Sequence, residues 1–288
     1  MFIDSHCHLN FPELKGDLDA ILQRMVQASV DQAVCICTKV EEADEVLHIA
    51  EQHNNLWASV GVHPDNEGVS EPSQGWLVQR SHHPRVVAIG ETGLDYYRLN
   101  GRTVADMQWQ RDRFATHIAA ARAVDLPLVV HTRSASDDTM RMLRELGGYG
   151  SVDAAGTGEG VATDNGTALP RARGVLHCFT ESLEVAKAAL DIGFYISFSG
   201  IITFKNAADL REVVAYVPND RFLIETDSPY LAPAPHRGKT NTPAFVPLVA
   251  QQIAQCKHIS VEEVGRLSSE NFYRLFSKAS VVAPVSLP

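Results

Sequence analysis

The first residues able to do chemistry are two histidines near the start of the chain. His6 and His8 are separated by one residue and follow a short strand-like run at 2–5. Residues i and i+2 of a β-strand point to the same face, so we expect both imidazoles on one side of the strand. Two neutral imidazoles at a strand end can chelate a divalent metal. Because His-x-His pairs also occur by chance, this pair alone does not define a site.

Four more potential metal ligands follow, each at the end of a predicted strand. They are Glu91, His131, His177 and Asp227. Each has an ordinary alternative role: Glu91 as an exposed loop acid, His131 as a core histidine, Asp227 as a turn former or helix cap. Six such side chains falling independently at strand ends is improbable. The set as a whole therefore predicts a metal centre.

Eight short β-branched runs alternate with amphipathic segments along the chain. The predicted strands are 2–5, 32–37, 56–62, 86–89, 128–130, 175–176, 194–197 and 222–224. Helical patterns cover 102–124 and 182–192, and Ser260 with Glu263 forms a capping-box pattern that opens a last helix. Eight such repeats predict a single-domain α/β fold, the (β/α)8 TIM barrel, over 1–278. A barrel gathers the C-terminal ends of its strands at one mouth, where the six candidates could meet.

Two segments depart from this rhythm. Residues 147–173 are rich in glycine and have little to bury, which predicts a flexible insertion at the N-terminal end of the barrel, away from the chemistry. The tail 279–288 is predicted to be disordered.

Composition limits the classes of partner. The chain has 25 Lys+Arg and 35 Asp+Glu, a net charge of −10, so its overall field does not attract nucleic acid or anionic membrane. A polyanion would have to be held locally, by metals and a few cations. Five cysteines fit reduced thiols better than a disulfide framework. Without a basic leader or a long apolar run, we expect a cytoplasmic protein with no membrane partner and no obligate protein partner.

Five motifs together resemble the TatD family of metal-dependent deoxyribonucleases, which belongs to the amidohydrolase-like TIM barrels. The motifs are FIDSHCHLN (2–10), GVHP (61–64), GETGLDY (90–96), PLVVHTR (127–133) and ETDSP (225–229). The resemblance spans 1–276, and the Gly-rich segment is its main departure. It implies that His6, His8 and Asp227 hold one metal and that His131 and His177 hold a second, with Glu91 bridging the two.

A pair of metals can bind one phosphate oxygen each, activate a water and stabilise the leaving oxygen of an in-line displacement. Asp227 is our choice of general base, and Glu91 joins it as a catalytic residue through its bridging position. Four imidazoles with two carboxylates favour two Zn²⁺ ions, with Mn²⁺ or Mg²⁺ as alternatives. Asp4 shares a strand face with His6 and could accept a hydrogen bond behind the ligands, or be a satisfied core residue.

Four further residues are candidates for substrate binding: His63, Tyr96, Arg133 and Glu225. Arg133 points the same way as His131 if the strand persists, and it could bind phosphate or form a surface salt bridge. His63 suits phosphate hydrogen bonding, and Tyr96 suits base stacking or core packing. Glu225 could order water or balance a buried cation.

The leading interpretation is a divalent-metal-dependent hydrolase that cleaves the phosphodiester bonds of DNA at the barrel mouth. The resemblance implies a 3′-5′ exodeoxyribonuclease acting on single-stranded DNA. An alternative keeps the metal pair but assigns a small lactone, amide or phosphotriester as substrate, and the acidic charge leans that way. A binding or scaffold protein that kept its metals is a third possibility, and no residue of the set favours it.

Overall fold

The fold is known from a computed structural model that describes residues 1–149 and 169–280. Eight parallel strands form one sheet whose order follows the sequence. They are β1 (Phe2–Cys7), β2 (Val30–Cys35), β3 (Leu56–Val60), β4 (Val86–Asp95), β5 (Leu128–Arg133), β6 (Gly174–Leu176), β7 (Tyr195–Phe198) and β8 (Phe222–Ile224). The sheet closes on itself, because the Asp227 amide donates to the His6 carbonyl at 3.0 Å and the His8 amide to the Ser228 carbonyl at 2.8 Å. The predicted TIM barrel is confirmed.

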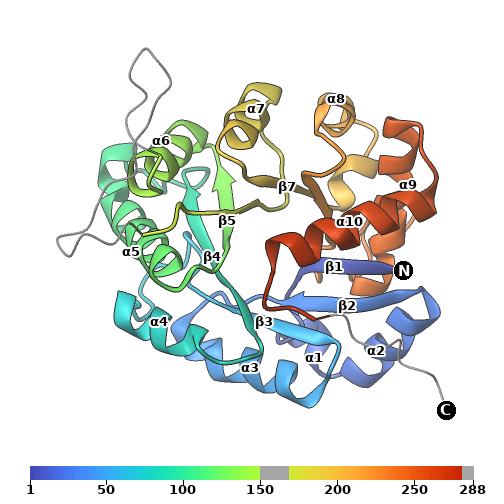
Figure 1. Cartoon of the computed structure of the whole chain (residues 1–288), viewed down its shortest axis with the longest axis horizontal. Coiled ribbons are helices and arrows are strands. Elements are labelled where there is room, and N and C mark those ends of the chain that lie inside the picture. The colour runs from blue at the N-terminus through green and yellow to red at the C-terminus, as the bar shows by residue number, and fades with distance from the viewer. Residues whose placement is uncertain (150–168, 281–288) are drawn as a thin grey trace.

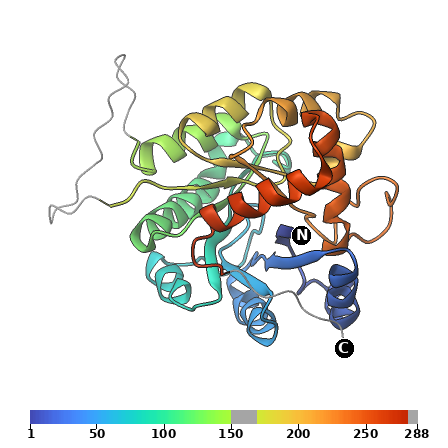
Figure 2. The same ribbon diagram turned by 45° about the vertical axis from the view of Figure 1, so that its right-hand side comes forward.

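Helices surround this sheet on the outside (Figures 1 and 2). They are α1 (Pro12–Lys15), α2 (Leu18–Gln27), α3 (Ala43–Gln52), α4 (Gln74–Ser81), α5 (Gln108–Val124), α6 (Ser136–Leu146), α7 (Leu183–Asp191), α8 (Ala208–Tyr216), α9 (Val246–Lys257) and α10 (Val261–Leu275). Only half of the predicted capping box forms at α10: the Ser260 hydroxyl accepts from the Glu263 amide at 3.1 Å, while the Glu263 carboxylate pairs with Arg266. The cap still supplies one acceptor to the otherwise unpaired amides of the first turn.

Strands β4 and β5 extend further than predicted, to Asp95 and Arg133, because they continue to pair with each other. Gly93 lies opposite His131 and Asp95 lies opposite Arg133. A Cβ at Gly93 would collide with the His131 carbonyl, and the φ of +130° at this position also favours glycine. Glu91 and His131 therefore stand on paired strands rather than on the loops that follow them.

The open end of the barrel is the end that carries the candidate ligands. A hydrophobic cluster joins interior strand residues to the last helix: Ile3, Val34, Trp57, Val129, Val175, Leu223, Phe272 and Phe276 are all buried. At the N-terminal ends of the strands, Gln32 donates to the Tyr273 hydroxyl at 2.8 Å and Asn271 to the Phe222 carbonyl at 2.9 Å. Helix α10 thus lies across the N-terminal end (Figure 2), and the C-terminal mouth is left for function.

The predicted Gly-rich insertion is described only at its two arms. The Ala172 amide donates to the Gly147 carbonyl at 2.8 Å, which joins the arms between α6 and β6, at the N-terminal end of the barrel. Residues 150–168 of the insertion and 281–288 of the predicted tail lie outside the described residues. All five cysteines are free thiols. In the described ranges no helix has the length and apolar character needed to cross a bilayer.

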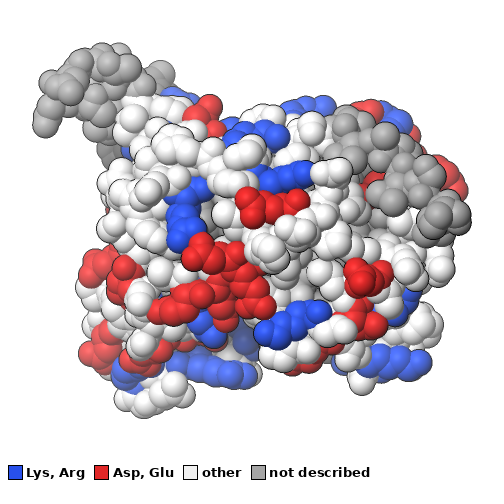
Figure 3. Space-filling view, turned by 90° about the horizontal axis from the view of Figure 1, so that it is seen from below, with Lys and Arg blue, Asp and Glu red and all other residues white. Residues whose placement is uncertain are grey.

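The outer surface agrees with the acidic composition. Figure 3 shows the side of the barrel that carries α3 and α4, where Asp and Glu side chains gather in one area with Lys and Arg around them. This side presents no continuous basic surface to a polyanion. A polyanionic substrate would have to be held by the mouth itself.

Candidate metal centre

The first group of candidate ligands combines the end of β1 with the segment that follows β8. The Nε2 atoms of His6 and His8 lie 3.2 Å apart. Oδ1 of Asp227 lies 3.5 Å from Nε2 of His6 and 3.4 Å from Nε2 of His8. Both histidines are buried, and the Asp227 side chain is 15% exposed, so this cluster opens to the mouth through its carboxylate.

The second group gathers around Glu91 on β4. Its Oε1 lies 2.7 Å from Nε2 of His177, 3.4 Å from Nδ1 of His131 and 3.3 Å from Nε2 of His63. His63 was predicted as a substrate residue, and its place here makes it a potential fourth member of this cluster. Its ring also contacts His131, with centroids 4.6 Å apart.

Glu91 joins the two clusters through its two oxygens. While Oε1 faces the second cluster, Oε2 lies 3.4 Å from Nε2 of His6 and 3.8 Å from Nε2 of His8. Burial acts to raise the pKa of Glu91, but the neighbouring imidazoles, His177 first, outweigh it and hold this pKa well below its usual value. The side chain is therefore an ionised carboxylate placed between two sets of nitrogens.

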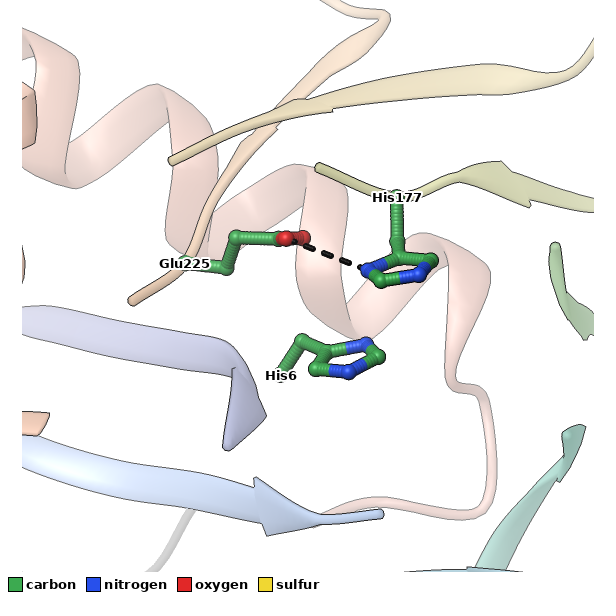
Figure 4. Close-up of side chains that lie close together, drawn as sticks. All are labelled: His6, His177 and Glu225. Atoms are coloured by element: carbon green, nitrogen blue, oxygen red, sulfur yellow. Dashed lines mark hydrogen bonds and ion pairs between the residues drawn. The ribbon is translucent and has the colours of Figure 1, made fainter. Parts of the chain in front are cut away.

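Three of the four predicted histidine ligands use their second ring nitrogen to contact an oxygen. His8 Nδ1 lies 3.3 Å from the Ile36 carbonyl, and His131 Nε2 lies 3.0 Å from Oδ2 of Asp95. His177 Nδ1 lies 3.3 Å from Oε1 of Glu225 (Figure 4). Metal-bound histidines are commonly oriented in this way by a carbonyl or carboxylate. The contacts leave the opposite nitrogen of each ring directed at its cluster.

His6 is held differently. Its ring stacks on that of His177 with centroids 3.9 Å apart and planes 5° from parallel, as Figure 4 shows. Its backbone amide donates to Oδ1 of Asp4 at 3.2 Å, and the other oxygen of Asp4 accepts from the Thr226 hydroxyl at 2.5 Å. Asp4, predicted as a partner behind the ligands, thus fixes the backbone of β1 against the β8 loop rather than an imidazole ring.

The donor atoms of both clusters fit divalent metal ions. Atoms that bind one Zn²⁺ tetrahedrally at about 2.1 Å lie about 3.4 Å apart. The separations of 3.2, 3.5 and 3.4 Å in the first cluster match that value, and so do the distances of 3.3 and 3.4 Å from Oε1 of Glu91 to His63 and His131. Oε1 of Glu91 lies closer to His177, at 2.7 Å. The Nε2 atoms of His6 and His8 face each other in a buried site, and the Nδ1 of His6 makes no hydrogen bond among the described residues. Burying such nitrogens is costly unless something binds them. The donor set of nitrogens and carboxylate oxygens suits Zn²⁺ or another transition metal.

Two predicted substrate residues are placed differently from the predicted roles. Glu225 is fully buried, and its Oε1 accepts from the Cys178 amide at 2.8 Å as well as contacting His177. The geometry gives it the task of orienting His177 rather than touching substrate. Tyr96 is 7% exposed, and its hydroxyl donates to Asp138 at 2.8 Å and accepts from Arg111 at 3.0 Å. Of the two roles predicted for Tyr96, base stacking and core packing, its position agrees with core packing.

Arg133 lies at the mouth. Strand β5 persists through this residue, as the prediction requires, and Arg133 lines the cavity above the two clusters. Its guanidinium lies over the ring of Tyr97, 3.6 Å from the centroid, and Tyr97 is 58% exposed. The exposed aromatic ring at this position is thus Tyr97, the neighbour of Tyr96.

Sequence reasoning missed a set of buried polar side chains on α5. Gln110, Arg113 and His117 are at most 3% exposed, and their spacing places them on one face of the helix. Arg113 donates to the His63 carbonyl at 2.8 Å, and His117 Nε2 accepts from the Val62 amide at 3.1 Å. Gln110 binds both the amide and the carbonyl of Asp95, at 2.9 and 3.0 Å. Helix α5 therefore fixes the backbone of two residues, His63 and Asp95, that contact the second cluster.

Comparison with known proteins gives an independent result. The family described as TatD related DNase matches residues 3–277. The uncharacterized metal-dependent hydrolase YcfH of Escherichia coli K12 is 42% identical over 278 residues, covering 95% of each chain. The corresponding protein YabD of Bacillus subtilis is 37% identical over 277 residues, covering 96% of this chain and 99% of its own.

Solved structures are similar over the whole barrel. The TatD homologue YjjV of Escherichia coli superimposes with a TM-score of 0.82 at 30% identity, covering 96% of this chain and 98% of its own. An organophosphorus hydrolase variant of Deinococcus radiodurans superimposes with a TM-score of 0.60 at 15% identity, covering 96% and 92%. The second similarity concerns the fold alone.

Proposed function

This chain belongs to the TatD-related DNase family of metal-dependent hydrolases, and from that membership we propose that it removes nucleotides from the 3′ end of single-stranded DNA. The observation that carries the proposal is the position of Glu91. One carboxylate faces two adjoining sets of ligand atoms, which is the arrangement expected of a two-metal phosphodiesterase.

The ligands divide between two ions. Family resemblance assigns His6, His8 and Asp227 to the first, His131 and His177 to the second, and Glu91 to both. The ligand atoms of His6, His8 and Asp227 lie within 4.8 Å of one another, and so do those of His63, Glu91 and His131, which puts His63 within reach of the second ion. The ions would supply positive charge that polarises a phosphate oxygen and lowers the pKa of an attacking water. Zn²⁺ suits this donor set, and Mn²⁺ or Mg²⁺ are the alternatives to be compared.

Asp227 is the group that would accept the proton of the attacking water. Burial acts to raise its pKa, but the hydrogen bond with His8 and the charge of His6 lower it below its usual value, so the carboxylate is ionised. It lines the cavity and is the most exposed of the first-cluster ligands. A carboxylate that reaches both the ligand cluster and the cavity can act as a general base.

The mouth is suited to an anionic chain. A cavity of about 960 Å³ lies over the clusters, and Lys39, Arg98 and Arg133 are among the residues that line it. Within the described ranges neither Arg98 nor Arg133 has a carboxylate partner, so their charges are available to a phosphate. Local cations of this kind can hold DNA although the protein as a whole carries a net charge of −10.

Nucleotide release from a 5′-labelled single-stranded oligonucleotide tests the proposal. Chelator-stripped protein is loaded with Zn²⁺, Mn²⁺ or Mg²⁺, and Asp227→Asn serves as the matched inactive variant. A ladder that shortens from the 3′ end only with metal, and only in the wild type, is the expected result. Metal-loaded protein that leaves DNA intact but hydrolyses a lactone, amide or phosphotriester would overturn the DNA substrate and keep the metal centre.

A further inference from the structure

One side of the mouth is lined by apolar and aromatic side chains. Phe11, Ile201, Tyr230 and Leu231, which follow β1, β7 and β8, line the cavity. The ring of Phe11 stacks on His8 with centroids 4.6 Å apart and planes 17° from parallel. The ring of Tyr230 meets Phe11 edge-on at 6.1 Å and is 51% exposed. The rings of Phe11 and Tyr230 therefore form an aromatic corner of the cavity, directly beside the first cluster.

The opposite side of the mouth carries two arginines that line the cavity. Arg98 and Arg133 follow β4 and end β5, and in a closed barrel with strand order β1 to β8 these strands lie across from β8 and β1. Neither Lys nor Arg lines the cavity on the β7, β8 and β1 side in the part of the chain that the structure describes. The candidate metal clusters lie between a side that suits phosphates and a side that suits a flat apolar group.

We infer that Phe11 and Tyr230 form a subsite for the terminal nucleobase of a DNA strand, an inference that rests on the proposed function. With the scissile phosphate over the clusters, the next phosphate along the strand reaches Arg98 and Arg133. The nucleoside beyond the scissile phosphate then enters the aromatic corner. A base offers a flat π-face to Tyr230 and Phe11, and such stacking tolerates every base.

The same asymmetry explains why cleavage would occur at an end. Continuing the strand past the aromatic corner would place another phosphate beside Phe11, Tyr230, Ile201 and Leu231. Besides Arg98 and Arg133 the described lining has one more cation, Lys39 after β2, and its charge is already paired with Glu42 at 3.1 Å. A single terminal nucleoside avoids the cost of placing an unbalanced phosphate charge beside apolar side chains. Base pairing would also have to be broken for the ring to reach Tyr230, so the corner favours an unpaired end.

The test compares two 5′-labelled oligonucleotides of one sequence, one ending in an ordinary 3′ nucleotide and one ending in an abasic 3′ residue. For the first cut by metal-loaded wild type, kcat/KM should fall roughly 10-fold on the abasic substrate, mainly through KM, because base stacking is lost. Tyr230→Leu should remove this discrimination. Tyr216→Leu is the matched control, since Tyr216 lies on α8 and is 50% exposed; it should keep the wild-type ratio.

A spectroscopic measurement separates stacking from folding defects. An oligonucleotide with 2-aminopurine at the 3′ end is titrated with chelator-stripped protein, and its fluorescence should be quenched by the wild type and Tyr216→Leu but not by Tyr230→Leu. Equal kcat/KM on both oligonucleotides, or unchanged discrimination in Tyr230→Leu, would overturn the subsite alone. No release from either oligonucleotide by metal-loaded protein would overturn the exonuclease function and the subsite with it.

Discussion

Oε1 of Glu91 lies 2.7 Å from Nε2 of His177, and the other oxygen of the same carboxylate faces the first histidine pair. Replacing Glu91 with Gln keeps the shape but removes the charge that both clusters share. We expect metal content to fall from two ions to one or none and activity to fall by about 10³-fold or more. Metal analysis of the purified variant and its rate of nucleotide release check this.

The control for that variant is Glu184→Gln on α7, which removes an exposed carboxylate in the first turn of a helix. It should keep both ions and full activity. Two tightly bound ions in Glu91→Gln would contradict the bridging role.

Glu225 is expected to tune metal affinity from behind His177. Glu225→Gln keeps an acceptor for the Cys178 amide but weakens the contact with Nδ1 of His177. Loss of such an outer partner typically lowers metal affinity by about 10- to 100-fold. Titration against a competing chelator measures the shift, and excess metal should restore much of the activity. An unchanged affinity would leave Glu225 as a packing residue only.

Arg113 is expected to support the loop that carries His63. Arg113→Met leaves the His63 carbonyl without its donor, which should lower the free energy of unfolding by about 1–3 kcal/mol and reduce activity. Its partner Glu71 is largely exposed and can be solvated, so the loss stays moderate. Arg141→Met on α6 is the control: its ion pairs are exposed, and the change should stay within about 0.5 kcal/mol. Urea unfolding and single-turnover rates measure both; equal effects would contradict the supporting role.

Removal of the metals should destabilise the protein as well as stop the reaction. Ions held at about 100 times their dissociation constant contribute about 2.7 kcal/mol each to the folded state. For a domain of this size, losing one or both ions on chelation corresponds to a fall in Tm of roughly 5–10 °C. Thermal unfolding with chelator and after adding back Zn²⁺ measures it. An unchanged Tm would argue against bound metal.

The sequence was sufficient to predict the barrel and to bring six candidate ligands together. The i, i+2 spacing predicted His6 and His8 on one side, and their Nε2 atoms do lie 3.2 Å apart, although the register of β1 shifts between Asp4 and Cys7 and His8 lies just beyond the strand. The barrel gathers strand ends that are far apart along the chain. Their convergence is what the geometry provides; their action as metal ligands stays a prediction until metal binding is measured.

Other features could not be read from the chain because local regularity ends near the site. The register of β4 against β5 shifts between Gly90 and Thr92, so counting alternation cannot tell whether Tyr96 or Tyr97 faces the mouth. Strand β8 ends at Ile224, so the same-face argument from Asp227 to Glu225 does not hold. The polar face of α5 resembles a solvent-exposed face in sequence, and only the packing of the helix shows that Arg113 meets a loop.

His117 should make stability depend on pH. Its Nδ1 lies 2.8 Å from the Arg113 carbonyl, and its Nε2 accepts from the Val62 amide, so the folded protein holds it neutral. Burial lowers the pKa of His117 to about 4, against an ordinary value of 6.5. Below pH 6.5 the unfolded chain therefore binds the proton more readily. The stabilisation is complete above pH 6.5 and is lost as the pH falls toward 4, to a total of about 3 kcal/mol.

Urea unfolding of chelator-stripped protein at pH 7 and pH 4.5 measures this loss, and His117→Gln provides the comparison. The variant is less stable at pH 7 because its amide fits the two backbone partners less well, but it has no group that titrates in this window. Its free energy of unfolding should therefore fall by about 2–3 kcal/mol less than that of the wild type between the two pH values. Other histidines titrate alike in both proteins and cancel in the difference. If both proteins lose the same free energy of unfolding between the two pH values, His117 is not the group that makes stability depend on pH.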